Sequence, residues 1–445
     1  MKNLERLFRA LLGLSMLLLL ICAGPADEAT ADTTDAADDW VKIGGSLRLR
    51  GEWKRNAQFG AETEANDEDY GLSQLRLWAD LDLAEWFDAH IELQDAHIFD
   101  QDAIDDTAVP SVFADELDLH QGYLDVRPSQ SEPIMFRLGR QKFNMGEQRL
   151  VSPLEWVNTA RVWDGVRLNY GERNDRMFDL FASVLVPVDP TAFNDREDSG
   201  NRMMDSQFHG IYVTDWNLLT EGQVEAYLLY RKHDALDDKI YTFGARAVRK
   251  WGSWSANAEG AGQTGTFIGT DHSAWMAHAE VAKTLSEKAG TIGAALNMGS
   301  GDADPLDDTH KTFDNLYPLN HAFYGYMDYF ALQNLRNLEL SYKVKTPHGA
   351  LLRIAYQAFW LLEPETDAWY VATGAPTRLA TGPAASAVGS EVDITLVYNL
   401  KKPHVGLLAG YSHFLPGQYV EDTGLTGLNE AADFFYLQSK LSFGD

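Results

Sequence analysis

A short stretch near the N-terminus, SLRLRGEW, places two arginines on the same face of an extended chain. Side chains alternate between the faces of a strand, so Arg48, Arg50 and Glu52 share one face while the leucines of Ser46–Trp53 share the other. A guanidinium group stays charged at physiological pH and matches a carboxylate in a two-pronged fork. A row of such groups is suited to binding an anion, provided that this face is wet and the other face is apolar.

The same pattern recurs in later segments. Arg76 shares a face with Asp80 in QLRLWADLDL, and Arg137 lies on the polar face of IMFRLGRQ. The chain as a whole carries a formal net charge of −29, and many of its acids fall in polar connections such as AETEANDED and NDREDSG. An excess of acid excludes general binding of nucleic acid, which needs a basic surface. A negative total is still compatible with a local row of cations.

Clusters of acidic residues are the other candidates for chemistry. The acidic stretch GDADPLDDTH offers oxygen ligands for calcium at Asp302, Asp304, Asp307 and Asp308, although it lacks the glycine and glutamate spacing of an EF-hand. No G-x-S-x-G, phosphate-binding loop or H-E-x-x-H motif occurs, so no enzyme activity and no cofactor are expected. Carboxylate pairs are common in the chain, which leaves a barrel enzyme acting on a glycan or lipid as an alternative.

The N-terminus has the form of a secretory signal. Lys2, Arg6 and Arg9 precede an apolar run, Leu11–Ile21, and Ala29 and Ala31 follow in an A-x-A arrangement. We therefore predict a signal peptide over residues 1–31, a short polar tail over 32–42 and one domain over 43–445. The only cysteine, Cys22, lies in the predicted signal, so neither a disulfide nor thiol chemistry is expected after cleavage.

Alternating segments dominate the rest of the chain and predict β-strands with two unlike faces. About 18 strands are expected, an even number within the range of bacterial outer-membrane barrels. Their predicted starts lie near Ile43, Gly71, Asp88, Glu116, Ile134, Arg161, Met177, Phe208, Gln223, Ile240, Trp254, Ser273, Thr291, Leu335, Ala350, Gly389, His404 and Ala432.

The connections between these segments alternate between short turns and long loops, as in a meander of hairpins. We therefore predict an all-β fold, a transmembrane antiparallel up-and-down barrel in the outer membrane, with the short turns in the periplasm. Its apolar residues face lipid and its charged residues face a wet lumen, because a charge facing lipid costs about 2–4 kcal/mol at the bilayer midplane. A water-soluble β-protein also alternates and remains the alternative fold.

Two long stretches carry a more specific pattern. RLGRQKFNMGEQRLVSPLEWVNTARVWDGVRLNY spans residues 137–170, and GSGDADPLDDTHKTFDNLYPLNHAFYGYMDYFALQNL spans 299–335. Both resemble the alginate export family of outer-membrane proteins, in which G-x-x-R-L-V, P-L-x-W and A-R-x-x-D-G-V-R follow one another and T-F-D-x-L-Y-P occurs later. The hairpin GARAVRKWGSWSANAEGAGQTG, residues 244–265, also looks like that family.

The resemblance implies an 18-stranded monomeric barrel that passes an anionic, alginate-like polysaccharide outward. By motif position it adds Arg140, Arg149, Arg161, Asp164 and Arg167 to the lumen residues Arg48, Arg50, Arg76 and Arg137. The expected partners are the polysaccharide, outer-membrane lipids, the barrel-insertion machinery and periplasmic export proteins. The net charge of −29 departs from what a polyanion exporter needs. A small-solute porin on the same scaffold, a barrel enzyme and a purely structural barrel therefore stay open.

Overall fold

The computed structural model describes residues 40–57, 67–99, 111–128, 132–191, 193–194, 206–400, 404–424 and 430–444. The predicted signal peptide and most of the predicted polar tail lie outside these residues. Within the described residues no helix is long and apolar enough to span a membrane.

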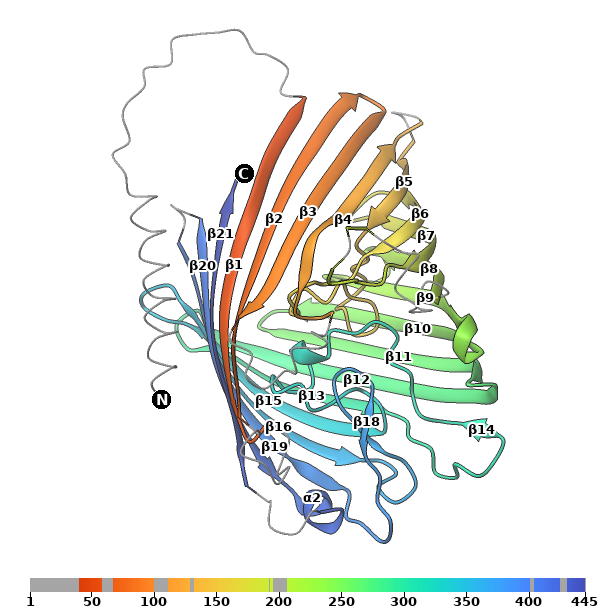
Figure 1. Cartoon of the computed structure of the whole chain (residues 1–445), viewed down its shortest axis with the longest axis vertical. Coiled ribbons are helices and arrows are strands. Elements are labelled where there is room, and N and C mark those ends of the chain that lie inside the picture. The colour runs from red at the N-terminus through yellow and green to blue at the C-terminus, as the bar shows by residue number, and fades with distance from the viewer. Residues whose placement is uncertain are drawn as a thin grey trace.

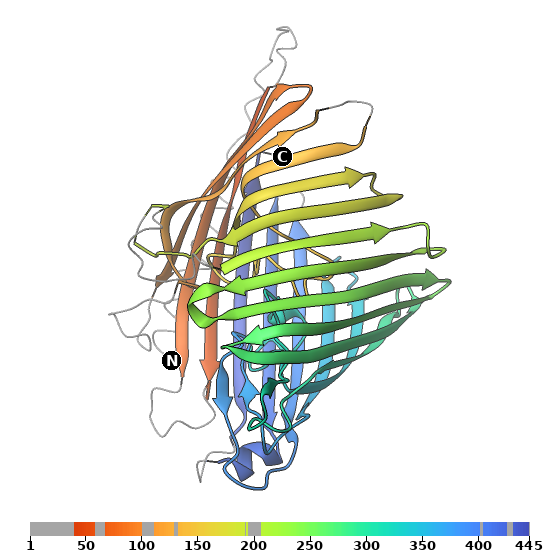
Figure 2. The ribbon, with the colours of Figure 1, turned by 90° about the vertical axis from the view of Figure 1, so that its right-hand side faces the viewer.

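Eighteen long antiparallel strands of the described residues close into one barrel (Figures 1 and 2). The strands of its first half are β1 (Val41–Arg55), β2 (Glu68–Ala84), β3 (Phe87–Phe99), β4 (Asp115–Val126), β5 (Ile134–Gln141), β6 (Trp163–Gly171), β7 (Arg176–Leu185), β8 (Ser206–Asp215) and β9 (Gly222–His233). Those of its second half are β10 (Asp238–Trp251), β11 (Trp254–Phe267), β12 (Thr270–Ser286), β13 (Gly290–Gly299), β15 (Leu335–Lys345), β16 (Leu351–Leu361), β19 (Ala387–Leu400), β20 (Val405–Pro416) and β21 (Ala432–Phe443).

Each barrel strand pairs with its neighbours along the chain, and β1 pairs with β21 to close the barrel, from Gly45 opposite Phe443 to Arg55 opposite Asp433. The remaining elements lie in connections: η3 (Asp234–Leu236), β14 (Thr309–His310), η4 (Asn320–Ala322), β17 (Trp369–Tyr370), β18 (Pro376–Arg378) and α2 (Gln418–Asp422). The predicted fold class is confirmed, and every predicted strand start lies within three residues of the observed one.

The connections differ from the prediction in one respect. At one end of the barrel, long stretches of sequence do separate the ends of consecutive strands, at 56–67, 100–114, 142–162, 186–205, 300–334, 362–386 and 417–431. At the same end, however, residues 234–237 and 268–269 form tight turns. Strands β9–β12 are therefore joined to one another by tight turns at both ends of the barrel.

The two faces of the strands are sorted as predicted. On β2 and β19 the outward side chains Leu77, Leu83 and Ile394 are 38–46% exposed, whereas the inward Glu391 and Asp393 are fully buried. Trp53 lies on the face opposite Arg50, as expected, but is buried where it packs against Phe435 across the β1–β21 seam. An apolar outer face suits lipid, because a charged side chain that faces lipid is costly. The backbone adds no such cost, since a barrel satisfies its backbone hydrogen bonds within its own wall.

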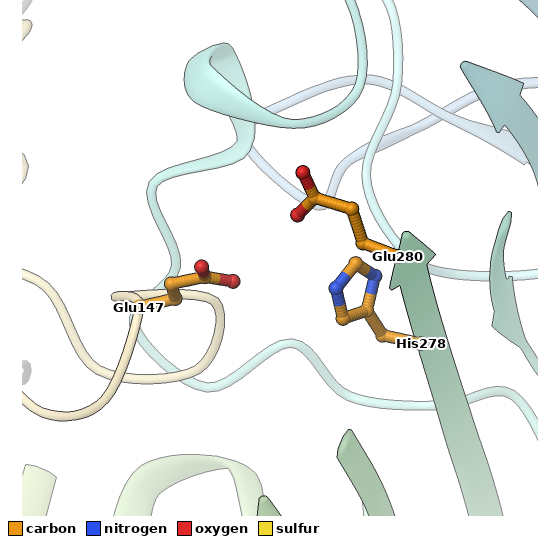
Figure 3. A group of neighbouring side chains, drawn as sticks. All are labelled: Glu147, His278 and Glu280. Atoms are coloured by element: carbon orange, nitrogen blue, oxygen red, sulfur yellow. The ribbon is translucent and has the colours of Figure 1, made fainter. Parts of the chain in front are cut away.

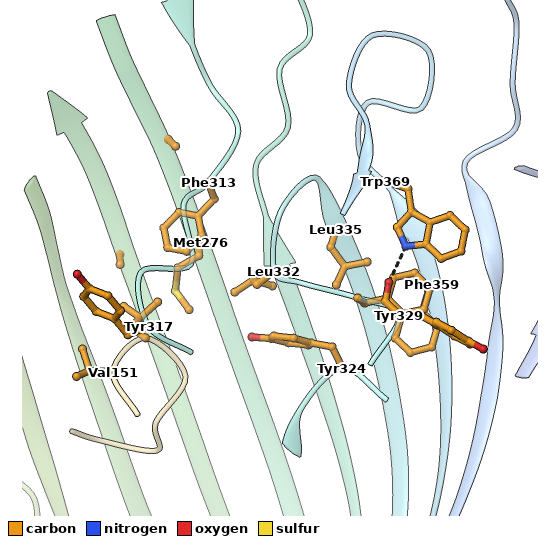
Figure 4. Packing of buried hydrophobic residues seen from close by; sticks show 14 of the residues in the cluster. Val151, Met276, Phe313, Tyr317, Tyr324, Tyr329, Leu332, Leu335, Phe359 and Trp369 are labelled. Carbon is orange, nitrogen blue, oxygen red and sulfur yellow. Dashed lines mark hydrogen bonds between the residues drawn. The ribbon is translucent and has the colours of Figure 1, made fainter. Parts of the chain in front are cut away.

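The inside of the barrel is filled by chain rather than by water alone. Two connections fold into it: residues 142–162, called the first inward loop, and residues 300–334, the second inward loop (Figure 1). Their apolar side chains pack with aromatic residues of the strands: Tyr317 contacts Phe208 with ring centroids 4.9 Å apart, and Phe330 stacks on Phe359 at 3.8 Å. Figure 4 shows part of this buried cluster. The buried core of this protein therefore lies within the lumen, and the two loops determine what space remains there.

Candidate functional site

The arginines that open the sequence hold the first inward loop in place. Arg48 donates hydrogen bonds to the carbonyl oxygens of Glu155 and Val157 at 2.7 and 2.8 Å and to the side chain of Asn158 at 3.2 Å. Arg50 donates to the carbonyl oxygen of Trp156 at 2.7 Å. An irregular loop has no ladder to satisfy its carbonyls, so buried guanidinium groups from β1 supply the missing donors.

Neighbouring strands continue this attachment through Asn158. The side-chain amide of Gln74 donates to the carbonyl oxygen of Asn158 at 2.6 Å. The side chain of Asn158 donates to the carbonyl oxygens of Ser73 and Phe113. Asn158 is 1% exposed, so all of these bonds are shielded from water. The first inward loop is thus fixed along the wall of β1–β3.

A charged group lies beside this attachment. Glu155 of the loop contacts Arg76 on β2 at 2.7 Å and Lys142 at 3.1 Å, and Lys142 also contacts Glu92 at 3.4 Å. Burial alone would raise the pKa of Glu155, but Arg76 and Lys142 outweigh it and hold this pKa well below its usual range. Glu155 is therefore ionised whenever the protein is near neutral pH.

These groups border a cavity of about 420 Å³ inside the barrel. Four cationic side chains line it, namely Arg48, Arg76, Lys142 and Lys440, together with two carboxylates, Glu92 and Glu155. Lys440 on β21 is exposed to this space and makes no ion pair within the described part of the chain. The lining therefore has an excess of positive charge, and Lys440 is its uncompensated member.

A second set of predicted residues forms ion pairs along the wall of β4–β7. Arg137 binds Asp125 through two bonds of 2.7 Å, and Arg140 binds Asp164 at 2.9 Å. Arg167 pairs with Asp179 on the adjacent strand through a bond of 2.8 Å and others. Each of these arginines is matched by a carboxylate on the wall, so this region contributes little net charge to the lumen.

The remaining two predicted arginines join the two inward loops to each other and to the far wall. Arg161 is half-buried and donates to the carbonyl oxygen of Pro318 at 3.1 Å, and its partial removal from water lowers its pKa to about 10. Arg149 donates to Asn297 on β13 at 3.1 Å and to the hydroxyl of Tyr324 at 3.2 Å. The structure therefore does not bring Arg149 and Arg161 to the cavity that Arg48 and Arg76 border.

Wall residues also fix the second inward loop. Arg231 on β9 contacts Asp314 at 2.7 Å, and Arg353 on β16 donates to the hydroxyl of Tyr326 at 3.3 Å. The buried carboxylate of Glu391 on β19 accepts a hydrogen bond from the backbone N–H of Met327 at 3.1 Å. Both loops are thus bound to the wall by polar bonds as well as by their aromatic packing.

The four aspartates proposed for calcium do not converge. Asp302 accepts bonds from the backbone of Asp304 and Lys311, Asp304 accepts one from Leu306, and Asp307 accepts one from Thr309 and pairs with Lys311. These bonds are those of local turns in which a carboxylate satisfies nearby N–H groups. Among the described residues, the one group of three or more ligand side chains that does converge lies elsewhere, at Glu147, His278 and Glu280.

Sequence reasoning missed Lys142, Lys440 and Glu155 as lining residues of the cavity. The position of Lys440 was visible, since it shares the polar face of the last strand with Tyr436 and Gln438. Glu155 gave no signal, because its place depends on an irregular loop that folds back into the barrel.

The closed barrel, its apolar outer face and its constricted, charged lumen define an outer-membrane channel. The sequence matches the alginate export family over residues 39–432, nearly the whole chain, and the protein belongs to this family. No protein of curated function matches the sequence.

Several solved structures of proteins from pseudomonads have similar folds. The BenF-like porin of Pseudomonas fluorescens Pf-5 has a TM-score of 0.61 at 11% identity, covering 91% of this chain and 99% of that one. Pseudomonas aeruginosa OpdK with vanillate gives 0.60 at 10% identity, with coverages of 90% and 98%. Pseudomonas aeruginosa OccK3 (OpdO) gives 0.57 at 15% identity, with coverages of 90% and 95%. At such identities the similarity establishes the fold alone.

Proposed function

We propose that this channel passes carboxylate-bearing saccharides across the outer membrane, and that an alginate-like polyuronate in a single extended strand is its substrate. The observation that carries the proposal is the cavity of about 420 Å³ beside the first inward loop, with its four cations and two carboxylates. Membership of the alginate export family supports the same substrate class.

The charges of this cavity suit transit rather than tight binding. The unpaired ammonium of Lys440 offers a carboxylate a partner, while Arg48 and Arg76 are occupied by the loop. Glu92 and Glu155 lie within the same lining and weaken the hold on any one anion. Conduction requires that a solute binds well enough to enter and weakly enough to leave.

A small-solute channel is the second candidate, and the inward loops favour it. Their aromatic side chains, such as Phe143 and Tyr324, are buried in one cluster with residues of the strands, which leaves little space for a thick polymer while both loops are in place. A single saccharide strand or a small organic acid makes a lesser demand on this space. The solved relative with vanillate concerns a small aromatic acid bound to that protein, at only 10% identity to this chain.

Planar-bilayer recordings of the purified protein test the proposal. In a gradient of potassium chloride we expect a reversal potential that shows anion preference. We expect alginate to block the current when it is added on the side of the bilayer from which it reaches the 420 Å³ cavity. Lys440→Glu should shift selectivity toward cations and weaken the block, because fixed charge near a narrow, low-dielectric passage acts strongly on ions. Lys288→Glu, in the exposed turn between β12 and β13, is the matched control and should change neither.

The outcomes separate the candidates. Block by alginate chains together with anion preference supports the polyuronate. Block by monomeric uronate but not by the polymer favours the small-solute channel. A strong cation preference of the unmodified protein contradicts both anionic substrates. As further proposals, the protein acts as a monomer in outer-membrane lipids, is inserted by the barrel-insertion machinery and meets periplasmic export proteins.

A further inference from the structure

Three ligand-type side chains meet where the tip of the first inward loop reaches the far wall. Glu147 comes from the loop, and His278 and Glu280 come from β12, two residues apart and therefore on the same inward face (Figure 3). One donor atom of each lies within 4.8 Å of the others. A zinc ion binds its ligands at about 2.0–2.2 Å, so a small inward rotation of these side chains suffices to enclose one.

The imidazole of His278 has one ring nitrogen available to bind a metal ion. It is 5% exposed, and its Nδ1 lies 2.7 Å from the side-chain oxygen of Asn297 on β13. An oxygen accepts only from a protonated ring nitrogen, so this bond leaves Nε2 with a free lone pair. Nε2 has no hydrogen-bond partner in the described structure and points toward Glu147 (Figure 3). A metal-binding histidine usually donates a hydrogen bond from its other ring nitrogen in this way.

The loop is shaped to deliver Glu147 to this place. Its tip turns at Gly146, whose φ of +55° is strained for other residues and whose missing Cβ would lie 2.8 Å from the hydroxyl of Tyr212. Gln148 follows with a φ of 67° and donates its N–H to the carbonyl oxygen of Met145 at 2.9 Å. The glycine of the G-x-x-R-L-V motif thus lets the loop approach the wall.

The charges around the group leave room for a divalent cation. Glu147 contacts Arg246 at 3.3 Å and Arg149 at 3.4 Å, and it also accepts a hydrogen bond from Asn257 at 2.5 Å. The same two arginines also pair with two further carboxylates, since Arg246 contacts Glu225 at 3.0 Å and Arg149 contacts Glu259 at 3.7 Å.

Glu280 has no ion pair or hydrogen bond among the described residues, and Lys343 does not come within ion-pair distance of it. Farther out, Glu339 is neutralised by Arg353. Two guanidinium groups, those of Arg149 and Arg246, thus face four carboxylates, those of Glu147, Glu225, Glu259 and Glu280. The excess of two negative charges matches the charge of one divalent ion.

We propose that Glu147, His278 and Glu280 bind one divalent transition-metal ion of the zinc type, which fastens the tip of the first inward loop to β12. One imidazole nitrogen with two carboxylates suits zinc and its neighbours, whereas calcium and magnesium prefer oxygen ligands alone. Water completes the coordination on the open side. The site does not depend on the identity of the transported solute.

Calorimetric titration of the detergent-solubilised barrel with Zn²⁺, after chelator treatment and removal of the chelator, tests the site. We expect one ion per chain, and an affinity at least ~10-fold lower in His278→Gln and in Glu280→Gln, as loss of a metal ligand or its support usually causes. Glu280→Gln is the safer variant for folding, because the native carboxylate holds no partner. The matched control, Asp304→Asn with Asp308→Asn, removes carboxylates that do not converge and should bind as the native protein does.

Heat-modifiable migration on gels establishes that each variant is folded. Absence of a single saturable site in the native protein overturns the proposal, as does undiminished binding by both folded ligand variants. Calcium is the second probe. Its failure to displace zinc supports a site of mixed nitrogen and oxygen ligands, and equal competition by calcium contradicts it.

Discussion

Trp156 and His321 lie face to face, with ring centroids 3.6 Å apart and ring planes inclined by 12°. The contact joins the first inward loop to the second. Arg50 on β1 also lies over the Trp156 ring, 4.0 Å from its centroid, and Tyr326 stacks on His321 at 4.8 Å. Arg353 on β16 lies 5.6 Å from the centroid of the Tyr326 ring. One continuous stack therefore spans the lumen side of the wall from β1 to β16, two strands that β19, β20 and β21 separate along the barrel.

Truncation of this stack is expected to open the channel. Trp156→Ala removes an aromatic contact worth about 0.5–1.5 kcal/mol, so we expect the population of the open state to rise by up to ~10-fold. Single-channel recording measures the open fraction and the conductance. Trp254→Ala, on the apolar outer surface, is the control and should leave both unchanged. If Trp156→Ala conducts as the native protein does, the stack does not limit passage.

Arg48 offers a test of whether the buried arginines hold the loop or act on the solute. Arg48→Ala leaves the carbonyl oxygens of Glu155 and Val157 without donors, which costs about 1–3 kcal/mol each when such groups stay buried. We expect lower thermal stability and faster proteolytic cleavage within residues 142–162. Arg55→Ala, at an exposed ion pair with Asp67, is the control. An intact loop with altered anion selectivity would instead indicate direct contact with the solute.

The ion pairs of Glu155 predict a pH dependence. Because its pKa is held below the usual value of about 4.3, these pairs contribute their full stability above that value and lose it only as the pH falls through the lowered pKa. The native channel should therefore show the same current noise at pH 7 and pH 5. The Glu155→Gln channel should be noisier at both pH values. The loss of stability that causes this noise should stay below about 1 kcal/mol, because the Glu155 side chain is 43% exposed. Glu172→Gln, in an exposed turn, is the control, and noise that rises in the native channel by pH 5 contradicts the assignment.

The orientation of the barrel is testable by labelling. Leu306 lies at the long-loop end and is 94% exposed, whereas Lys288 lies in the short turn between β12 and β13. With long loops outside the cell, Leu306→Cys should react with a membrane-impermeant maleimide on intact cells and Lys288→Cys only after lysis. The reverse pattern would invert the barrel. Cys22 belongs to the predicted signal peptide, so no native thiol of the mature chain is expected to interfere.

The barrel was predictable because one physical rule acts on every strand. Lipid outside and polar groups inside impose an alternation that can be read at Leu75–Leu83 or at Glu391–Leu396 without knowledge of neighbouring strands. The positions of strand starts follow from the same rule. The short connections at 234–237 and 268–269 break the predicted alternation of loop lengths, and no long polar run marks them in the sequence.

The site was less predictable, because its contacts join positions far apart in the sequence. The inward direction of Arg48 follows from alternation, but its partners, the carbonyl oxygens of an irregular loop more than a hundred residues later, have no sequence signature. Glu147 and His278 meet for the same kind of reason, through a loop that crosses the lumen. The sequence indicates that a side chain faces inward, and only the folded loops determine what it meets there.

The pairing of Gly45 with Phe443 constrains the order in which the molecule is assembled. Every other pairing between barrel strands joins consecutive strands, but this one must wait for the last strand to arrive. Until β21 pairs with β1, the strands at the two edges of the open sheet each present a row of free N–H and C=O groups, which hydrocarbon cannot satisfy. A partly inserted chain is therefore a curled, open sheet with two unpaired edges. The pairing of β21 with β1 removes both edges in one step.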